Sequence, residues 1–313
     1  MLLCLTPNPA IDRVLVVPGF RAAEVCRVTE RHDLAGGKGL NVVRAARTLD
    51  LPARVCGPLA GDTGRAIASL AEAEGLASDW AWLPAGESRI CILVTDPAAH
   101  DTLTINEPGP KLGAAEWEAL AAHIRAAAGG ATALASSGSL PPGVSPAAYT
   151  GLLAEINASR PVFLDTSGAT LVAALDLPLA MLKINAHEIG EALGRTIDTP
   201  EAAGAAAREV QRRGPRTVVV TLGRQGAVAV DASSAWWARP PEIAPVSPVG
   251  SGDTLLAGVA AGVLRGAALP EALRLGVACG SANALVLGAG IMHRADVERM
   301  HAATDLVRLL ASA

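Results

Sequence analysis

Short apolar segments alternate with stretches of helical length along most of the chain, and this alternation restricts the fold more than any other feature. The apolar segments are LLCLT at the start, then ATALASSG, PVFLDTSG, AMLKINA and TVVVTLG. Stretches rich in Ala and Leu lie between them, for example Ala114 to Ala128 and Pro200 to Arg213. Because such alternation is typical of βαβ units, we predict an α/β fold with a doubly wound, mostly parallel sheet flanked by helices.

Polar residues gather directly after these apolar segments, in TPNPAID, SSGSLPPG, DTSG, NAHE and TLG. In open parallel sheets, ligands bind beyond the carboxyl ends of the strands. The sequence therefore places the candidate site at that edge of the sheet. The 313 residues, 50% of them hydrophobic, suffice for one large domain that spans residues 1–313.

Two pairs of segments depart from this pattern and alternate apolar with polar residues, as half-exposed strands do. They are DRVLVVPG with CRVTERHDLAGG, and SRICILVTD with HDTLTINEP. We predict that residues about 11–34 and 88–107 form one small antiparallel sheet, inserted into the larger domain as a lid. Exposed sheet faces and edges invite pairing, so we also expect a homodimer formed through this lid.

Charge and composition exclude several classes of protein. The formal net charge is −4 and the pI is about 5.9, whereas nucleic-acid surfaces hold phosphates with clustered Lys and Arg. No apolar run reaches the roughly 18 residues that spanning a bilayer needs, and the N-terminal segment lacks the basic region of a signal peptide. We therefore expect a soluble chain with no nucleic-acid or membrane partner. The 5 single cysteines favour a reducing, cytoplasmic setting.

The segment SPVGSGDTLLAG places one carboxylate, Asp253, at the predicted start of a helix. Gly250, Ser251 and Gly252 let the backbone turn tightly, and free N–H groups at a helix start bind anions. Asp253 fits an ordinary helix cap, which contributes about 1 kcal/mol. It also fits a general base that takes a proton from an acceptor hydroxyl while the amides hold a phosphoryl group. The two interpretations do not exclude each other.

A second glycine-rich segment, AGGKGLNVVRAARTL, has the same character. Gly36, Gly37 and Gly39 permit close approach of a ligand to the backbone, and Lys38 and Asn41 fall near the first turn of an amphipathic helix. A simple strand-to-helix turn would explain the glycines but would not require the Lys and the Asn. Neither segment matches the dinucleotide fingerprint GxGxxG or the Walker A loop GxxxxGK[ST].

Together, the two segments resemble the signature regions of the PfkB, or ribokinase-like, family of sugar kinases: Gly-Gly-Lys-Gly-x-Asn early and Gly-Ala-Gly-Asp late. The late region here reads Gly-Ser-Gly-Asp, which is a small-for-small change. Further elements occur in the expected order over nearly the whole chain: TPNPAID, GDTG, SR, INEPGP, GSLPPG, DTSG, KINAHE and TLGRQGA. They resemble the phosphofructokinase and tagatose-6-phosphate kinase branch of the family.

The resemblance implies a role for each matching residue. Asp253 would be the catalytic base, with Gly250, Ser251 and Gly252 as the anion hole for the γ-phosphate. The residues that would bind the sugar or its phosphate are Asp12, Gly37, Lys38, Asn41, Arg89, Ser139 and Arg27. Those that would bind the nucleotide are Asn185, Glu188, Thr221, Gly223 and Ser247, and Glu188 would help to position Mg²⁺ through water.

Several of these residues also have an ordinary structural interpretation. Asp12 fits a turn, and Asn185 and Glu188 fit a helix start. Arg89 opens the second lid strand where this branch holds the existing phosphate, and Arg27 matches a lid residue that reaches across a dimer interface in related kinases. Both arginines also fit solvated surface positions.

One departure from the family pattern concerns the substrate. The branch often has Asn two residues beyond the lid arginine, where this chain has Cys91. A thiol is a weak hydrogen-bond partner. Cys91 therefore bears on which sugar is bound more than on the reaction.

The sequence thus predicts an ATP-dependent kinase of a phosphorylated ketohexose, with Mg²⁺ arriving on the ATP phosphates. Fructose 6-phosphate, fructose 1-phosphate and tagatose 6-phosphate are the candidate substrates. The alternative within enzymes is a kinase of an unphosphorylated sugar or nucleoside, with Arg89 and Arg27 serving only the fold of the lid. The alternative from another class is a catalytically silent sugar-binding regulator on the same scaffold.

Overall fold

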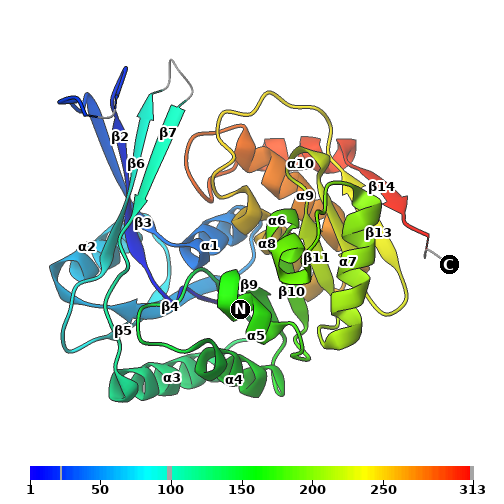
Figure 1. Ribbon diagram of the computed structural model, residues 1–313, viewed down its shortest axis with the longest axis horizontal. Coiled ribbons are helices and arrows are strands. Elements are labelled where there is room, and N and C mark those ends of the chain that lie inside the picture. The colour runs from blue at the N-terminus through cyan, green and yellow to red at the C-terminus, as the bar shows by residue number, and fades with distance from the viewer. Residues whose placement is uncertain (22, 97–100, 311–313) are drawn as a thin grey trace.

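The computed structural model describes residues 1–21, 23–96 and 101–310, and within them ten strands form one large sheet (Figure 1). In order across the sheet they are β14 (Asp305–Arg308), β13 (Ala235–Arg239), β12 (Ala227–Val230), β11 (Val218–Thr221), β10 (Met181–Asn185), β9 (Val162–Asp165), β8 (Ala133–Ser137), β1 (Leu2–Leu5), β4 (Ala53–Leu59) and β5 (Ser78–Trp82). The strands from β11 across to β5 are parallel, and β12, β13 and β14 extend one edge as antiparallel strands. The predicted α/β fold with a mostly parallel sheet is confirmed.

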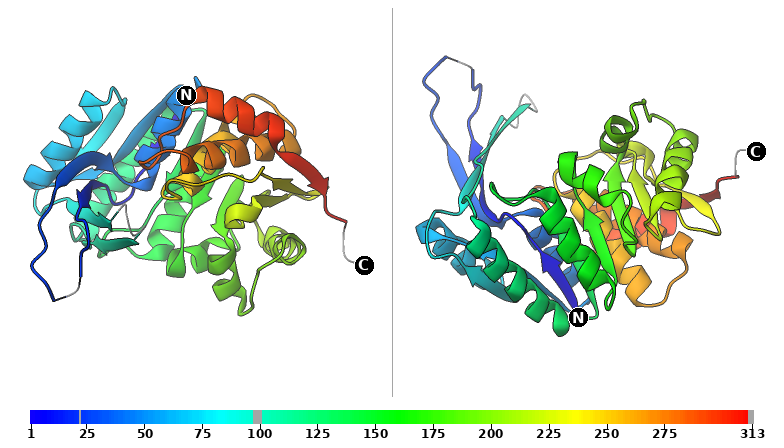
Figure 2. Two further views of the ribbon diagram at one scale, coloured as in Figure 1. Left: turned by 90° about the horizontal axis from the view of Figure 1, so that it is seen from above. Right: turned by 60° about the horizontal axis from the view of Figure 1, so that its bottom comes forward.

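Helices cover both faces of the large sheet, as Figures 1 and 2 show. One face carries α1 (Lys38–Thr48), α2 (Gly61–Ala73), α8 (Ser251–Leu264), α9 (Leu269–Ala284) and α10 (Arg294–Ala303). The other face carries α3 (Ala114–Gly129), α4 (Pro146–Asn157), α5 (Gly168–Ala174), α6 (Ala186–Leu193) and α7 (Pro200–Arg213). A short 3₁₀ helix, η1 (Gly223–Gln225), follows β11. None of the helices in the described residues is both long enough and apolar enough to cross a bilayer.

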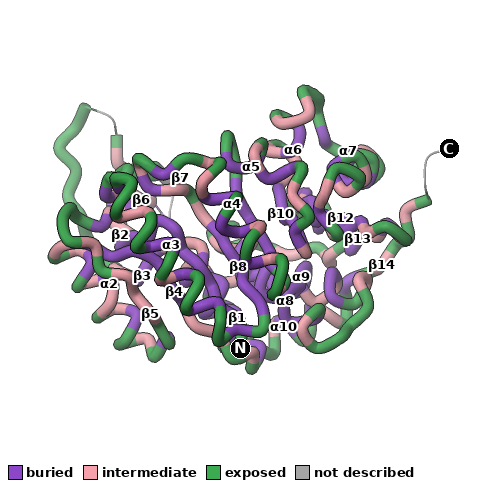
Figure 3. Tube along the Cα trace, turned by 90° about the horizontal axis from the view of Figure 1, so that it is seen from below, coloured by how far each residue is buried: buried purple, intermediate pink, exposed green. Residues whose placement is uncertain are grey.

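The central strands are apolar on both sides because helices cover both faces. In β1, Leu2 and Cys4 belong to the core beneath α1 and α8, whereas Leu3 and Leu5 belong to the core on the opposite face. The strands β8 and β9 are likewise buried along their whole length. Figure 3 shows β1 and β8 in purple in the middle of the molecule.

Glycines allow α8 and α9 to pack at short distance. A Cβ atom at Gly258 would lie 2.7 Å from the Cα atom of Gly276, and one at Gly262 would lie 2.7 Å from the Cα atom of Ala272. Any larger side chain at Gly258 or Gly262 would therefore push the helices apart. This packing holds α8 in place, and the first turn of α8 carries Asp253.

A second, smaller sheet has the order β3 (Glu30–Gly36), β2 (Ala10–Val16), β6 (Arg89–Asp96) and β7 (Asp101–Asn106). The outer pairs β2–β3 and β6–β7 are antiparallel, as the sequence pattern predicts. The central pair β2–β6 is parallel, which we did not expect. Both central strands leave the large sheet after one of its parallel strands, β1 or β5, and so run in the same direction. Figure 1 shows this small sheet projecting from the rest of the molecule.

Candidate active site

The register of the parallel strands brings the predicted polar residues to one edge of the large sheet. Ser137 at the end of β8 pairs with Asp165 at the end of β9, and Asp165 pairs in turn with Lys183 in β10. Asn185 at the end of β10 pairs with Thr221 at the end of β11. Opposed residues of neighbouring strands have side chains on the same face. The carboxyl ends of four adjacent strands therefore contribute to one site.

Asp253 is at the centre of this site and is 5% exposed. Its Oδ2 atom accepts a hydrogen bond of 2.8 Å from Nδ2 of Asn41 in α1. Burial raises the pKa of Asp253 to about 6; Asp165 also raises it, while Lys38, the hydrogen bond from Asn41 and Lys183 act in the opposite direction. A carboxyl group with this pKa is mostly ionised at neutral pH and basic enough to accept a proton.

The turn before Asp253 requires glycine at Gly250, where φ is 84°. In the part of the chain that the structure describes, the amides of Gly250 and Gly252 have no hydrogen-bond acceptor. The amide of Ser251 donates to the carbonyl of Pro248 at 3.2 Å. Two of the three predicted anion-hole amides are therefore unused by the protein itself.

Asp165 holds two lysines beside this helix start. It is 1% exposed, and its Oδ2 atom lies 3.1 Å from Nζ of Lys183, 3.6 Å from Nζ of Lys38 and 3.2 Å from Oγ of Ser137. Burial alone would raise the pKa of Asp165, but the two lysines and the hydrogen bonds from Lys183 and Ser137 outweigh it and lower the pKa. A Cβ atom at Gly252 would lie 2.8 Å from Nζ of Lys183, so this ammonium group lies against the first turn of α8.

Lys38 is surrounded by carboxylates from three elements. Asp165 has the largest effect in raising the pKa of Lys38; burial opposes it, and Asp253 and Glu188 raise the pKa further. Lys38 therefore stays protonated between the buried Asp253 and the predicted nucleotide-binding residue Glu188. A cation in this position can neutralise charge on a phosphoryl group during transfer.

Asp12 and Cys91 are paired in the small sheet, so their side chains lie on the same face of it. We call this face the inner face; on it, Asp12 accepts a hydrogen bond from the backbone of Gly37, which caps the start of α1. Burial raises the pKa of Asp12, while Arg44, a backbone hydrogen bond from Gly37 and Arg89 lower it. Burial has the largest effect on Cys91 as well and raises the pKa of its thiol. The Asp12 carboxylate is therefore next to the first turn of α1, as its predicted role in sugar binding requires.

Arg89 begins β6 on the same inner face. Its Nε atom donates to the carbonyl of Asn8 at 3.1 Å, and Nη1 donates to the carbonyl of Glu107 at 3.3 Å. Within the described residues, the guanidinium group forms no ion pair with a carboxylate. Its charge is therefore held near Asp12 without being neutralised by a direct partner.

Two predicted sugar-binding residues lie on the surface. Ser139 is exposed in the loop after β8, next to Gly138, where a Cβ atom would lie 3.9 Å from Cβ of Lys38. Ser139 is therefore adjacent to the site. Arg27 is exposed in the loop between β2 and β3, at the far end of the small sheet from Asp12 and Arg89. The structure does not bring Arg27 to the other predicted residues.

The predicted nucleotide-binding residues follow β10 and β11. Asn185 and Glu188 form a capping box at the start of α6: Asn185 Oδ1 accepts from the Glu188 amide at 2.8 Å, and Glu188 Oε2 accepts from the Asn185 amide at 3.1 Å. Thr221 Oγ1 donates to the carbonyl of Ile184 at 3.5 Å, and Gly223 begins η1 with open space beside its Cα atom. Ser247, in the loop before α8, accepts from the Val249 amide. The described residues contain no group of three or more His, Cys, Asp or Glu that could hold a metal ion.

Sequence reasoning assigned no role to Asp165, Lys183 or Arg44, although all three are part of this site. The motifs DTSG and KINAHE contain the first two, and both follow apolar segments. The occurrence of Asp165 and Lys183 in motifs that follow apolar segments is the only local sequence feature that points to these two residues. Arg44 follows Asn41 by three residues in α1, and nothing in the local sequence shows that its side chain is buried.

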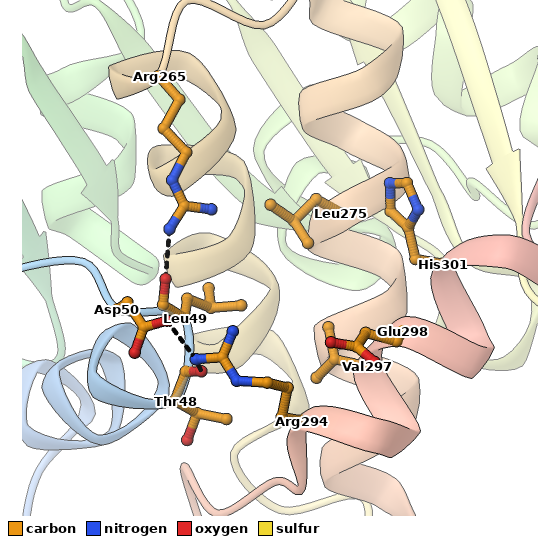
Figure 4. A pocket seen from close by; sticks show the side chains of 9 residues that line it. All are labelled: Thr48, Leu49, Asp50, Arg265, Leu275, Arg294, Val297, Glu298 and His301. Atoms are coloured by element: carbon orange, nitrogen blue, oxygen red, sulfur yellow. Dashed lines mark hydrogen bonds and ion pairs between the residues drawn. The ribbon is translucent and has the colours of Figure 1, made fainter.

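A separate pocket of about 360 Å³ lies at the ends of α1 and α8 that are opposite to Asp253 (Figure 4). Arg265, which directly follows α8, donates to the carbonyl of Leu49, which directly follows α1. Arg294 of α10 binds the carboxylate of Asp50 nearby. The helices α1 and α8 are therefore joined at both ends.

A buried carboxylate, unused amides at a helix start and clustered lysines are groups that a small-molecule kinase can use for phosphoryl transfer. Residues 6–295 match the model of the pfkB family carbohydrate kinases, and the chain belongs to this family. It is therefore an enzyme, a phosphotransferase with an alcohol group as acceptor.

The chain is similar to several phosphofructokinases over most of its length. It is 36% identical to the 1-phosphofructokinase of Rhodobacter capsulatus over 87% of this chain and 86% of that protein. It is 34% identical to the ATP-dependent 6-phosphofructokinase isozyme 2 of Mycobacterium tuberculosis over 95% and 88% of the two chains. The solved structure of phosphofructokinase-2 from Escherichia coli, in its tetrameric inhibited form, superposes with a TM-score of 0.89 at 30% identity, covering 96% and 98% of the two chains.

Proposed function

We propose that this protein is an ATP-dependent kinase of a phosphorylated ketohexose, with Asp253 as the general base. The observation that carries the proposal is the pairing of a buried carboxylate of raised pKa with unused backbone amides in one helix start. Proton removal and stabilisation of a transferring phosphoryl group are the two tasks of such a kinase. Both tasks are then performed by the first turn of α8.

In the proposed reaction, a sugar hydroxyl donates its proton to Asp253 as its oxygen attacks the γ-phosphorus of ATP, the bond from this phosphorus to the β,γ-bridging oxygen breaks, and ADP leaves. The hydrogen bond from Asn41 engages Oδ2, so Oδ1 takes the proton. The amides of Gly250 and Gly252 bind the γ-phosphate, and Lys38 neutralises charge on its oxygens. Closure of the small sheet over the sugar excludes water that would otherwise hydrolyse ATP.

The nucleotide is proposed to bind as MgATP along the ends of β10 and β11. The capping box uses Oε2 of Glu188 and leaves Oε1 for a water molecule bound to Mg²⁺. Asn185, the other half of the capping box, is paired in register with Thr221, and the open space at Gly223 would accommodate the nucleotide. Ser247 approaches from the loop before α8.

The phosphate already on the substrate is proposed to bind Arg89. Because Nε and Nη1 donate to backbone carbonyls, the guanidinium group is held in a fixed orientation with Nη2 remaining for a phosphate oxygen. The names of the relatives, 1-phosphofructokinase and ATP-dependent 6-phosphofructokinase isozyme 2, support a fructose phosphate. Asp12 would bind sugar hydroxyls beside this phosphate.

A kinase of an unphosphorylated sugar or nucleoside is the second candidate. It is favoured by the same two carbonyl contacts of Arg89, since a residue with only a structural role would also make them. An assay of ADP release separates the candidates when it is run with fructose, nucleosides, fructose 6-phosphate, fructose 1-phosphate and tagatose 6-phosphate. Turnover of fructose but of none of the phosphates would show that the proposed substrate class is wrong. ATP consumption with none of them would support the non-catalytic regulator.

A homodimer through the small sheet is also proposed. The face opposite to Asp12, which we call the outer face, is covered by α2 only near its base, where Ile11 and Ile90 join the large core. Farther along, Leu103 and Ile105 of β7 are 49% and 48% exposed. Apolar side chains on an exposed sheet face mark a contact surface. A tetrameric form of the Escherichia coli phosphofructokinase-2 supports association between copies.

A further inference from the structure

Arg44 is a buried arginine in the second turn of α1, and it contacts both the candidate site and Glu74, the residue that follows α2. It is 4% exposed. Its Nη1 atom donates to Oδ1 of Asn41 at 2.9 Å. Its Nε and Nη2 atoms form a two-point ion pair with Glu74, at 2.6 and 2.7 Å, and Nη2 also donates to the carbonyl of Ala35.

These contacts determine how the Asn41 amide is oriented. A guanidinium group can only donate hydrogen bonds, so the atom of Asn41 that faces Arg44 must be the carbonyl oxygen. The amide nitrogen of Asn41 then faces Asp253, where it donates to Oδ2 at 2.8 Å. An ionised carboxylate can only accept, so the order from Arg44 through Asn41 to Asp253 is consistent at every contact.

We propose that Arg44 is a positioning residue for the catalytic base: it locks the side-chain amide of Asn41 in the one orientation that donates a hydrogen bond to Asp253. The inference rests on the proposed function, because it concerns Asp253 as a base. Glu74 holds the guanidinium group in turn by fixing two of its three nitrogens. Arg44 itself does not reach Asp253 and so acts on it through Asn41.

The lock matters because the two orientations of the amide have opposite effects on the carboxylate. A donated N–H stabilises the ionised form of Asp253, whereas a carbonyl oxygen in the same place would repel it. The charged groups that face Asp253 are Lys38 of α1, Asp165 of β9 and Lys183 of β10. Within the described residues no hydrogen bond or ion pair joins Arg44 to Asp253, so the contact between the two groups runs through the Asn41 amide.

A purely structural role for Arg44 is the alternative, since the ion pair with Glu74 joins α1 to the residue that follows α2. Loss of one partner of a buried pair destabilises a protein strongly. That role predicts a lower melting temperature and a loss of activity in proportion to unfolded protein. It does not predict any change in the pH at which the folded enzyme loses activity.

The experiment compares Arg44→Met with the wild type by measuring kcat/KM for the sugar phosphate between pH 5 and pH 9. Loss of the donated hydrogen bond raises the pKa of Asp253, so the acid limb of the profile moves up by about one pH unit. At pH 6 the variant is then roughly fivefold slower than the wild type, and most of the loss is recovered at pH 8. A limb at the wild-type position would overturn the proposal.

Two further variants separate positioning from folding. Arg44→Met/Glu74→Gln removes both charges of the ion pair, so that no carboxylate is left unpaired, and the same shift is expected. Arg47→Met is the matched control, because Arg47 is an exposed arginine of the same helix that donates to the carbonyl of Glu74 but does not contact Asn41. It should leave the acid limb in place; a limb that moves equally in Arg47→Met would contradict the proposal.

A double-mutant cycle tests the route through Asn41. Asn41→Ala should itself raise the acid limb, and adding Arg44→Met to it should produce no further shift. A full additional shift would mean that Arg44 acts on the base by another path. Asp253→Asn is measured in the same series: if it stays active, the proposed function fails, whereas an inactive Asp253→Asn with an unmoved limb in Arg44→Met refutes only the role of Arg44.

Discussion

The two sheets of this protein differ in how completely they are covered. In the large sheet, helices pack on both faces, and strands such as β1, β8 and β9 are buried throughout. In the small sheet most side chains are only half-buried, and Leu103 and Ile105 are exposed on the outer face. The large sheet is thus complete within one chain. The small sheet would gain further burial from the proposed sugar on its inner face and from the proposed second copy on its outer face.

This difference suggests that the two sheets have different roles in the proposed reaction. Asp253, Asp165 and Lys183 belong to the large sheet and its helices, where the packing fixes their distances. Asp12 and Arg89 belong to the small sheet, which we propose closes over the substrate. We therefore expect substitutions on the large-sheet side to change kcat and those on the small-sheet side to change KM.

The largest effect is expected for Asp253→Asn. Removing a general base costs 10² to 10⁴ in rate, so kcat should fall by about that factor, while KM for the sugar stays nearly the same. Steady-state kinetics of the purified variant measures both constants, and a melting curve verifies that it is folded. Retention of more than about a tenth of the wild-type kcat would rule out this role for Asp253.

Arg89→Met should have the next largest effect and should act on binding. A hydrogen bond to a charged group contributes about 1.5–3 kcal/mol, so KM for the sugar phosphate should rise roughly 10- to 100-fold with little change in kcat. Arg13→Met is the matched control, because Arg13 lies on the outer face of the same sheet and pairs with Asp33. Equal changes in KM for the two variants would contradict a phosphate site at Arg89.

The pH profile offers a third test. Because the pKa of Asp253 is about 6 and the ionised form is the base, kcat/KM should fall tenfold for each unit of pH below that value. Asp12 on the small sheet also has a raised pKa, so Asp12→Asn is the control: its profile should keep the acid limb although its KM is higher. If the limb disappears in Asp12→Asn, the titrating base belongs to the small sheet.

The smallest effect on activity is expected at the outer face. A charge at an apolar contact surface weakens association, so Leu103→Asp or Ile105→Asp should convert a dimer into monomers. Sedimentation velocity measures this directly. Thr104→Asp places the same charge in the same strand on the opposite face and should leave the dimer intact. A wild-type protein that sediments as a monomer would remove the proposed dimer.

The large sheet was the more predictable of the two because its signals are local. Apolar strands, helical stretches and polar strand ends all recur in sequence order, and they are sufficient to bring Asp253, Lys38 and Asn41 to one edge. The Asn185–Glu188 capping box also follows from a local pattern, Asn-x-x-Glu at a helix start. In the small sheet, the same reasoning found the strands but missed the parallel central pair, which depends on where the strands leave the large sheet.

The partners of buried charges were not predictable. Lys183 and Asp165 are 18 residues apart, and Arg44 and Glu74 are 30 residues apart. Strand register selects the first pair and helix packing selects the second, and neither leaves a local pattern. For the same reason, the hydrogen bond from Asn41 to Asp253 could not be anticipated, and Asn41 was expected only to bind the sugar.

The contact between Arg265 and the carbonyl of Leu49 bears on how the activity of this enzyme could be changed from outside the candidate site. It joins the C-terminal ends of α8 and α1. The first turns of the same two helices hold Asp253 and Asn41, which are hydrogen-bonded to each other. Because α1 and α8 pack against each other, we expect a substitution at Arg265, which lines the pocket of Figure 4, to loosen the packing of the two helices. We therefore expect such a substitution to change turnover although Arg265 lies at the opposite end of α8 from Asp253.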